Sequence, residues 1–166
     1  MTRRGRESLR RAFRPAQIQL LFAGEAPPVS GRFFYRGDSG LYRAMRDAFA
    51  AIDPSIAGTD FLSRFREAGC YLVDLCPEPV DRLAPASRRA ICRASEASFA
   101  RTITQLQPRV IATLVRSIEG NVIAAASRAG WQGPFVHLPY PGRWDRHRKV
   151  FVELLQPALL ATLKKS

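Results

Sequence analysis

Glu25 and Asp74 are two carboxylates, and each lies at the end of an apolar run or just after it. Their type and position make them candidates for a chemical role. Glu25 lies in a loop stiffened by Pro27 and Pro28, which suits a carboxylate that orients water or stabilises a cation. A glutamate in a proline-rich turn can also be purely structural. The aromatic residues 33–35 follow closely. They are typical of a core, but an aromatic face beside a carboxylate is also what a stacked, flipped base needs.

The charge of the sequence points to its partners. The 166 residues carry a formal charge of +12, and 23 of the 26 basic residues are arginine. Six arginines fall in residues 1–16, and a second basic cluster fills residues 143–149. The arginine fork suits phosphate recognition, because it can bind two oxygens at once. The alternative is a charge that serves solubility, with a disordered basic tail.

Cysteine content and hydropathy narrow the class of protein. Cys70, Cys76 and Cys92 are too few for a disulfide framework and lack the spacing of a zinc or iron-sulfur site. No apolar run approaches the roughly 20 residues of a membrane span, and no signal peptide is recognisable. We therefore expect a monomeric cytoplasmic protein with reduced, buried cysteines, no membrane contact, no metal and no cofactor.

The elements that position these residues alternate along the chain. The sequence predicts strands at 17–22, 71–75, 110–115 and 135–138, with helices at 41–52, 87–106, 118–129 and 150–163. Such alternation predicts parallel pairing with right-handed crossovers. The expected fold is α/β: a three-layer α/β/α sandwich around a four-stranded, mainly parallel sheet. Functional loops then begin at the carboxyl ends of the strands, at Gly24, Asp74, Arg116 and Leu138.

The first of these loops resembles a known family. Gly24-Glu25-Ala26-Pro27 is similar to the Gly-Glu-Ala-Pro-Gly motif of the thermostable branch of the uracil-DNA glycosylase superfamily, and residues 31–34 resemble its Gly-x-Pro-Phe segment. The resemblance implies that Phe34 stacks on the base, that Gly24, Ala26 and Pro27 line its pocket, and that Glu25 is catalytic. It implies a glycosylase-like domain at 16–166 behind a basic extension at 1–15.

Two departures concern the recognition of the base. Where the family has an asparagine that reads uracil, this sequence has Asp74, which accepts hydrogen bonds but cannot donate when ionised. Asp74 would suit a base edge with two adjacent donors, as guanine presents, or an exocyclic amino group; alternatively it caps a turn or pairs with an arginine. In the family's second motif, Leu138 replaces the catalytic histidine and Tyr140 the serine, and the resemblance implies that Leu138 lines the base pocket. His137 is one residue early and would be catalytic only if the strand bulges; otherwise it is a packed or capping residue.

The resemblance also implies a surface that contacts DNA. The family's wedge loop corresponds to residues 141–144, and apolar wedges flanked by cations are the usual means of opening a base step. Trp144 could instead simply cover the last helix. The branch's iron-sulfur cluster needs four cysteines, so we expect none here. The expected DNA contacts are Tyr140, Gly142, Arg143, Trp144, Arg146, Arg148 and Lys149.

These residues favour a monofunctional DNA glycosylase of base excision repair, which flips a damaged or deaminated base from double- or single-stranded DNA and hydrolyses its N-glycosidic bond. The alternative is a catalytically weak or inactive superfamily member that binds nucleic acid or a nucleotide. A small-molecule α/β hydrolase is a third possibility, but no Gly-x-Ser-x-Gly elbow supports it.

Overall fold

The computed structural model describes residues 1–56, 60–142 and 144–163. Its centre is a sheet of four strands in the order β2-β1-β3-β4, and every neighbouring pair is parallel. The strands are β1 (Leu20–Gly24), β2 (Cys70–Asp74), β3 (Val110–Thr113) and β4 (Phe135–His137). The predicted fold class is therefore confirmed.

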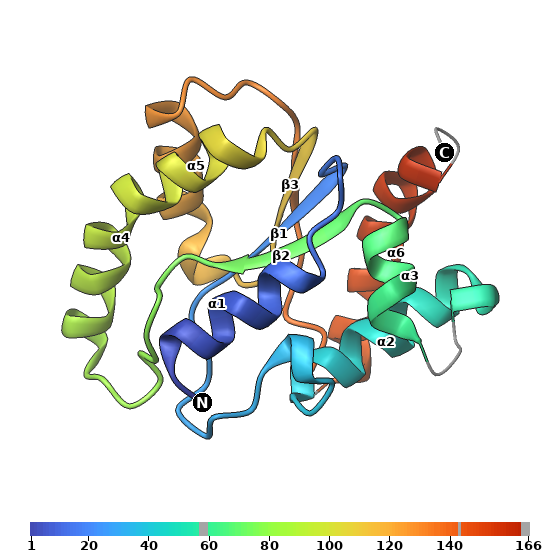
Figure 1. Cartoon of the computed structure of the whole chain (residues 1–166), viewed down its shortest axis with the longest axis horizontal. Coiled ribbons are helices and arrows are strands. Elements are labelled where there is room, and N and C mark those ends of the chain that lie inside the picture. The colour runs from blue at the N-terminus through green and yellow to red at the C-terminus, as the bar shows by residue number, and fades with distance from the viewer. Residues whose placement is uncertain (57–59, 143, 164–166) are drawn as a thin grey trace.

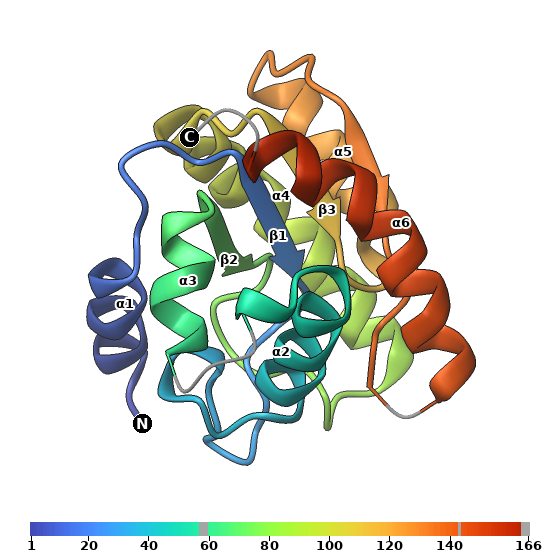
Figure 2. The ribbon, with the colours of Figure 1, turned by 90° about the vertical axis from the view of Figure 1, so that its right-hand side faces the viewer.

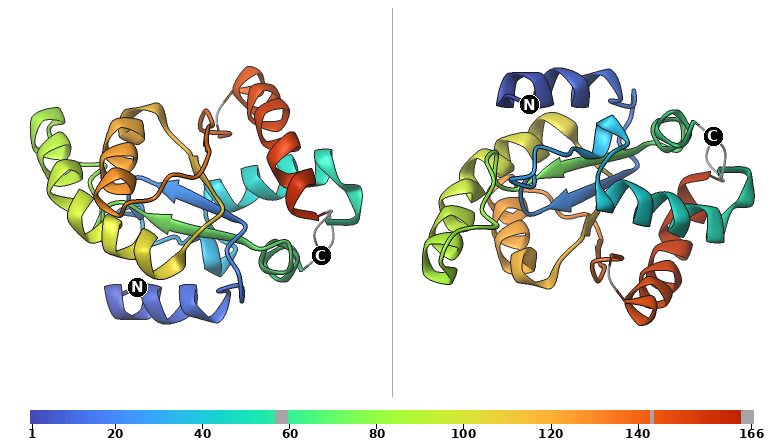
Figure 3. Two further views of the ribbon diagram at one scale, coloured as in Figure 1. Left: turned by 90° about the horizontal axis from the view of Figure 1, so that it is seen from above. Right: turned by 90° about the horizontal axis from the view of Figure 1, so that it is seen from below.

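Helices cover both faces of this sheet (Figures 1 and 2). The longer ones are α1 (Arg3–Ala12), α2 (Gly40–Ile52), α3 (Phe61–Glu67), α4 (Pro85–Leu106), α5 (Glu119–Arg128) and α6 (Asp145–Leu163). Helices α4 and α5 lie on one face and α2, α3 and α6 on the other, while α1 lies along the β2 edge (Figure 3). In this arrangement the carboxyl ends of β1 and β2 remain accessible, and the loops that follow these strands begin there.

The core explains why the strands form where they do. All five residues of β1 are buried, as a parallel strand covered on both faces requires. On one face Phe22 packs against Phe49 of α2 and Phe65 of α3, with ring centroids 6.2 and 5.6 Å apart. Helix α2 begins where the Ser39 side chain accepts a hydrogen bond from the amide of Tyr42, which satisfies one of the free amides of the first turn.

The bounds of the first strand differ from the expectation. The sequence predicts a strand at 17–22, but β1 starts at Leu20 and runs on to Gly24, where it pairs with Asp74 at the end of β2. The apolar run indicated that a strand forms but not where it ends. Ala23 and Gly24 were expected to begin a loop, because small residues and glycine are typical of turns, whereas both are buried residues of the strand. Glu25 consequently follows the last strand residue directly.

Two helices were not predicted. The basic segment at the N-terminus contains α1, which buries one face: Arg6 and Arg10 are 9% and 7% exposed. Phe13, which ends α1, stacks on Tyr35 with ring centroids 5.7 Å apart. Helix α3 has only seven residues and buries Phe61 and Phe65. Among the described residues, no helix is long and apolar enough to cross a membrane.

Candidate functional site

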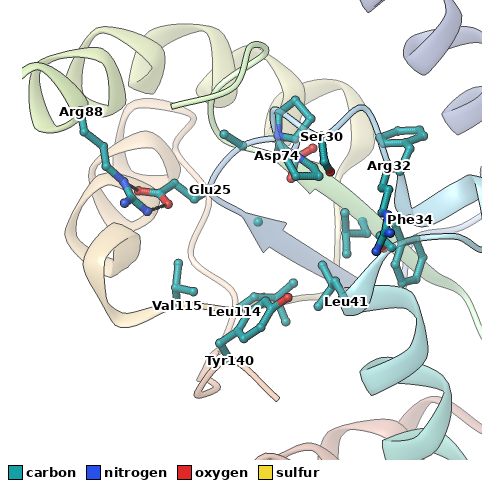
Figure 4. A pocket seen from close by; sticks show the side chains of 18 residues that line it. Glu25, Ser30, Arg32, Phe34, Leu41, Asp74, Arg88, Leu114, Val115 and Tyr140 are labelled. Atoms are coloured by element: carbon teal, nitrogen blue, oxygen red, sulfur yellow. Dashed lines mark hydrogen bonds and ion pairs between the residues drawn. The ribbon is translucent and has the colours of Figure 1, made fainter. Parts of the chain in front are cut away.

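A cavity of about 410 Å³ opens at the carboxyl ends of β1 and β2. Its walls come from the loop 24–28 after β1, from Phe33 and Phe34, from the start of α2 and from Asp74 (Figure 4). Glu25 lies at one end and Phe34 at the other, with Asp74 between them along one wall. The structure thus brings together three residues that the sequence singled out, from segments 49 residues apart.

Glu25 is held by an arginine that was not predicted. Arg88, in the first turns of α4, forms a two-pronged ion pair with it: Nε donates to Oε1 over 2.7 Å, and Nη2 donates to Oε2. The thiol of Cys92, one turn further along α4, lies 3.9 Å from Oε1. The Glu25 side chain is 13% exposed and that of Arg88 is 41% exposed. The pair therefore sits at the mouth of the cavity, where solvent reaches the guanidinium.

Asp74 is held by a second arginine, from the N-terminal helix. Nη2 of Arg10 lies 3.3 Å from Oδ2 of Asp74, and both side chains are more than nine-tenths buried. Burial raises the pKa of Asp74 to about 6, and the guanidiniums of Arg10 and Arg6 act against this rise. Among the alternatives considered for Asp74, an ion pair with an arginine is therefore present.

Phe34 forms part of an aromatic cluster as well as a wall. Its ring lies edge-on to Tyr35 and Tyr42, with centroids 5.1 and 6.0 Å away, and it also contacts Phe61 and Phe65. Only 3% of Phe34 is exposed. The cluster fixes the orientation of the ring, so that a flat ligand in the cavity would meet a rigid surface.

The segment after β4 contributes a different residue from the one expected. Tyr140 lines the cavity, opposite Asp74 (Figure 4), and burial raises the pKa of its phenol. Its ring also packs over Gly142, where an added Cβ would fall 2.2 Å from a ring carbon. Tyr140 was predicted to contact DNA, and the structure places it at the cavity.

His137 and Leu138 do not reach the cavity. Nδ1 of His137 lies 2.9 Å from the hydroxyl of Thr113, its partner on β3, and 3.9 Å from Glu119. The His137 ring stacks on Phe135 at 5.9 Å. Leu138 is 1% exposed and belongs to the core. β4 runs regularly through His137, paired in register with β3, so the bulge that a catalytic His137 would need is absent from this described strand.

The predicted DNA-contacting residues lie at the start of α6 and before it. Trp144 is 57% exposed, and the guanidinium of Arg146 lies 6.0 Å from its ring centroid. Lys149 is exposed, whereas Nε of Arg148 is buried and has no hydrogen-bond partner among the described residues. Arg143 lies outside the described residues. More than half of Trp144 is thus exposed just before α6.

The sequence contained a usable signal for Arg88 but none for Arg10. In a parallel α/β fold, the helix after a strand begins near that strand's carboxyl end, so basic residues in the first turns of α4 are candidates for the site. Arg10 precedes Asp74 by 64 residues and is brought to it only by the packing of α1.

Among the residues that the structure describes, His, Cys, Asp and Glu side chains nowhere gather in a group of three or more that could hold a metal ion. The cavity itself offers the carboxylates of Glu25 and Asp74, the guanidiniums of Arg32 and Arg88, and aromatic walls. No protein-family model matches the sequence, and the comparison with curated proteins finds no match.

Proposed function

We propose that the protein is a member of the uracil-DNA glycosylase superfamily whose cavity receives a base flipped out of DNA and hydrolyses its N-glycosidic bond. The observation that carries this proposal is the convergence of Glu25, Asp74 and Phe34 on one cavity at the carboxyl edge of the sheet. Glu25 and Phe34 are the residues that the resemblance assigns to catalysis and stacking. A cavity of about 410 Å³ is also of the size that small-molecule sites have.

The chemistry required of the site is modest. Breaking the bond between C1′ and the base nitrogen leaves positive charge on the sugar and negative charge on the base. A water oxygen then bonds to C1′, one water proton is lost, and the departing base gains one. Glu25 stabilises the sugar cation and orients the water, and the Arg88 guanidinium holds its carboxylate in place.

The basic surface supports DNA as the carrier of the base. Beside α1 lies a second hollow of about 340 Å³, whose lining includes Arg3, Arg11 and Arg14, and it shares Asp74 with the main cavity. Arginines grouped along a groove are suited to a phosphate backbone. The exposed Trp144, with Arg146 against it, suits the opening of a base step.

The test of hydrolysis is incubation with oligonucleotides that carry uracil, hypoxanthine, xanthine, 8-oxoguanine or a mismatch, followed by alkali to cleave abasic sites. Glu25→Gln should lower the cleavage rate by about 100-fold or more and leave DNA affinity nearly unchanged. Glu67→Gln is the matched control, because Glu67 forms an exposed ion pair on α3. Cleavage of none of these substrates would contradict the proposed enzyme, and full activity of Glu25→Gln would remove Glu25 from the mechanism.

A second candidate is a protein that binds the base or a nucleotide without hydrolysing it. Two observations favour it: both oxygens of Glu25 are engaged by Arg88, and His137 lies outside the cavity. This candidate predicts tight binding with no abasic product. For either candidate, affinity for DNA should fall steeply with added salt as counterions are released; a flat response would contradict DNA binding.

A further inference from the structure

The N-terminal helix α1 reaches the Asp74 carboxylate through the side chain of Arg10. Besides its contact with Oδ2 of Asp74, Arg10 donates from Nη1 to Oε1 of Glu7 over 2.6 Å. Its guanidinium also lies 5.7 Å from the ring centroid of Phe33, a residue of the cavity wall. With contacts on three sides, Arg10 fixes the position of the Asp74 carboxylate.

The other oxygen of Asp74 has no such partner. Oδ1 lies over Gly24, so close that an added Cβ at Gly24 would fall 2.5 Å from it. Gly24 pairs in register with Asp74, and both residues line the cavity. Within residues 1–56, 60–142 and 144–163, no hydrogen bond to Oδ1 is formed. A side chain only 8% exposed thus presents an unpaired acceptor to the cavity.

An acceptor that faces the cavity without a protein partner has a clear preference among ligands. A ligand that displaces water from Oδ1 must replace the hydrogen bond that the water made, and a ligand N–H at this point does so. A ligand carbonyl at the same point would face a carboxylate and be repelled. The site therefore distinguishes base edges by whether they present donors or acceptors beside Asp74.

We propose that Asp74, positioned by Arg10, selects a base whose edge presents two neighbouring N–H donors, as the N1–H and 2-amino groups of guanine and of damaged guanines do. Oδ1 accepts from one donor, and the lone pair that Arg10 leaves on Oδ2 accepts from the other. This inference rests on the proposed function, because it assumes that the cavity binds a base. Uracil is disfavoured, since its N3–H stands between two carbonyls and one of them would lie against the carboxylate. Hypoxanthine keeps the N1–H but lacks the amino group, so it makes only one of the two contacts.

Binding of free nucleosides to the whole protein tests this preference without requiring hydrolysis. Calorimetry at pH 7.5 would compare guanosine, inosine, uridine and adenosine. Guanosine should bind about 10- to 100-fold more tightly than inosine, which differs from it only by the amino group that would meet the charged acceptor. Uridine and adenosine should bind more weakly still, because each places an acceptor near Asp74.

Variants then assign the preference to particular residues. Asp74→Asn should reduce the guanosine-to-uridine affinity ratio at least about 10-fold, since an amide donates as well as accepts. Asp47→Asn on α2 is the matched control, because Asp47 pairs with Arg46 at the surface. Arg10→Met should weaken guanosine binding while leaving the affinity for adenosine nearly unchanged, which a merely structural role would not do.

The outcomes separate this inference from the proposed function. Equal binding of guanosine, inosine and uridine to the wild-type protein overturns the inference but leaves a base-binding cavity, and this result does not depend on any variant folding. Binding of none of the four overturns both. A guanosine preference without cleavage of any DNA substrate supports the inference and contradicts only the hydrolysis.

Discussion

Two carboxylate–arginine pairs stand at the ends of neighbouring strands, and they differ in what surrounds them. Asp74 and Arg10 are both more than nine-tenths buried, and Arg10 belongs to a helix packed on the sheet edge. Glu25 is similarly covered, but its partner Arg88 is 41% exposed. When both side chains of an ion pair are buried, removing one leaves the other as an uncompensated buried charge, which is costly. When one side chain is exposed, water can replace the lost partner at little cost in free energy. The same two residue types therefore form a buried ion pair at the end of β2 and a partly exposed one after β1.

The largest expected effect comes from removing the buried arginine. Arg10→Met leaves the Asp74 carboxylate buried without its cation, which should lower the free energy of unfolding by about 3–5 kcal/mol at pH 7.5. Urea denaturation would measure it. Adding Asp74→Leu to Arg10→Met should restore most of the loss, because the uncompensated charge is gone. If Arg10→Met unfolds at the same urea concentration as the wild type, the two pairs do not differ in the way described.

The next largest effect is a pH dependence of the free energy of unfolding, which we expect from Asp74. Its ordinary pKa is 3.8, and burial raises it to about 6 in the folded protein. Between these values the folded state binds more protons than the unfolded chain, so the free energy of unfolding falls as pH rises, by up to about 3 kcal/mol. The charged and titratable groups that face Asp74 are Arg10, Arg6, Glu7, Tyr35 and Cys76.

Urea denaturation between pH 4 and 7 would measure this slope as the difference between the wild type and Asp74→Asn. The two curves should converge in slope above pH about 7, where Asp74 is ionised in both the folded and the unfolded wild type. Parallel curves throughout would show that burial of Asp74 carries no such cost.

A smaller effect is expected from a substitution at Gly24, which displaces the Asp74 carboxylate and leaves Arg10 and Arg88 in place. Gly24→Ala places a Cβ 2.5 Å from Oδ1 of Asp74, so the carboxylate must move. We expect a loss of about 1–3 kcal/mol in stability and weaker guanosine binding, measured by denaturation and calorimetry. Gly120→Ala on α5 is the control, because nothing lies within 4 Å of its added Cβ. Unchanged guanosine affinity in Gly24→Ala would contradict the role given to Oδ1.

The smallest effect on stability is expected at the exposed pair. Arg88→Met should change the free energy of unfolding by less than about 1 kcal/mol, because Arg88 is partly in water. If Glu25 is catalytic, the same variant should lower kcat with little change in KM, since the carboxylate loses the group that orients it. A destabilisation as large as that of Arg10→Met would remove the distinction between the pairs.

The sequence predicted the sheet better than the site. Apolar runs bounded by Gly and Pro indicated all four strands, and the alternation with helices indicated their parallel pairing, because burial of both faces leaves a strong local signal. Helix α1 was missed because six of the ten residues from Arg3 to Ala12 carry charge, and its buried face contains Arg6 and Arg10, which periodicity counts as polar. Helix α3 was too short to show a repeat.

For the candidate site, the sequence singled out Glu25, Asp74 and Phe34, which line one cavity, but the partners of the two carboxylates come from other elements. The bond between Arg10 and Asp74 is made by the docking of α1 and has no local trace in the sequence. The placement of His137 followed from the regular continuation of β4, which the sequence could not distinguish from a bulge. Residue types thus indicated the chemistry, while the packing of helices on the sheet decided which groups meet.

The attachment of α1 has a consequence for how the protein acquires its site during synthesis. The contacts of Arg10 with Asp74 and of Arg6 with Pro77 and Glu78 span 64, 71 and 72 residues, so α1 leaves the ribosome long before its partners do. A short, highly charged helix has little stability alone, and the closure of so long a loop is slow relative to local folding. The contacts of α1 with β2 and the residues after it can therefore form only once residues 70–78 have been synthesised, later than its contacts with Phe33 and Tyr35. The Asp74 carboxylate gains its cation only at that late step.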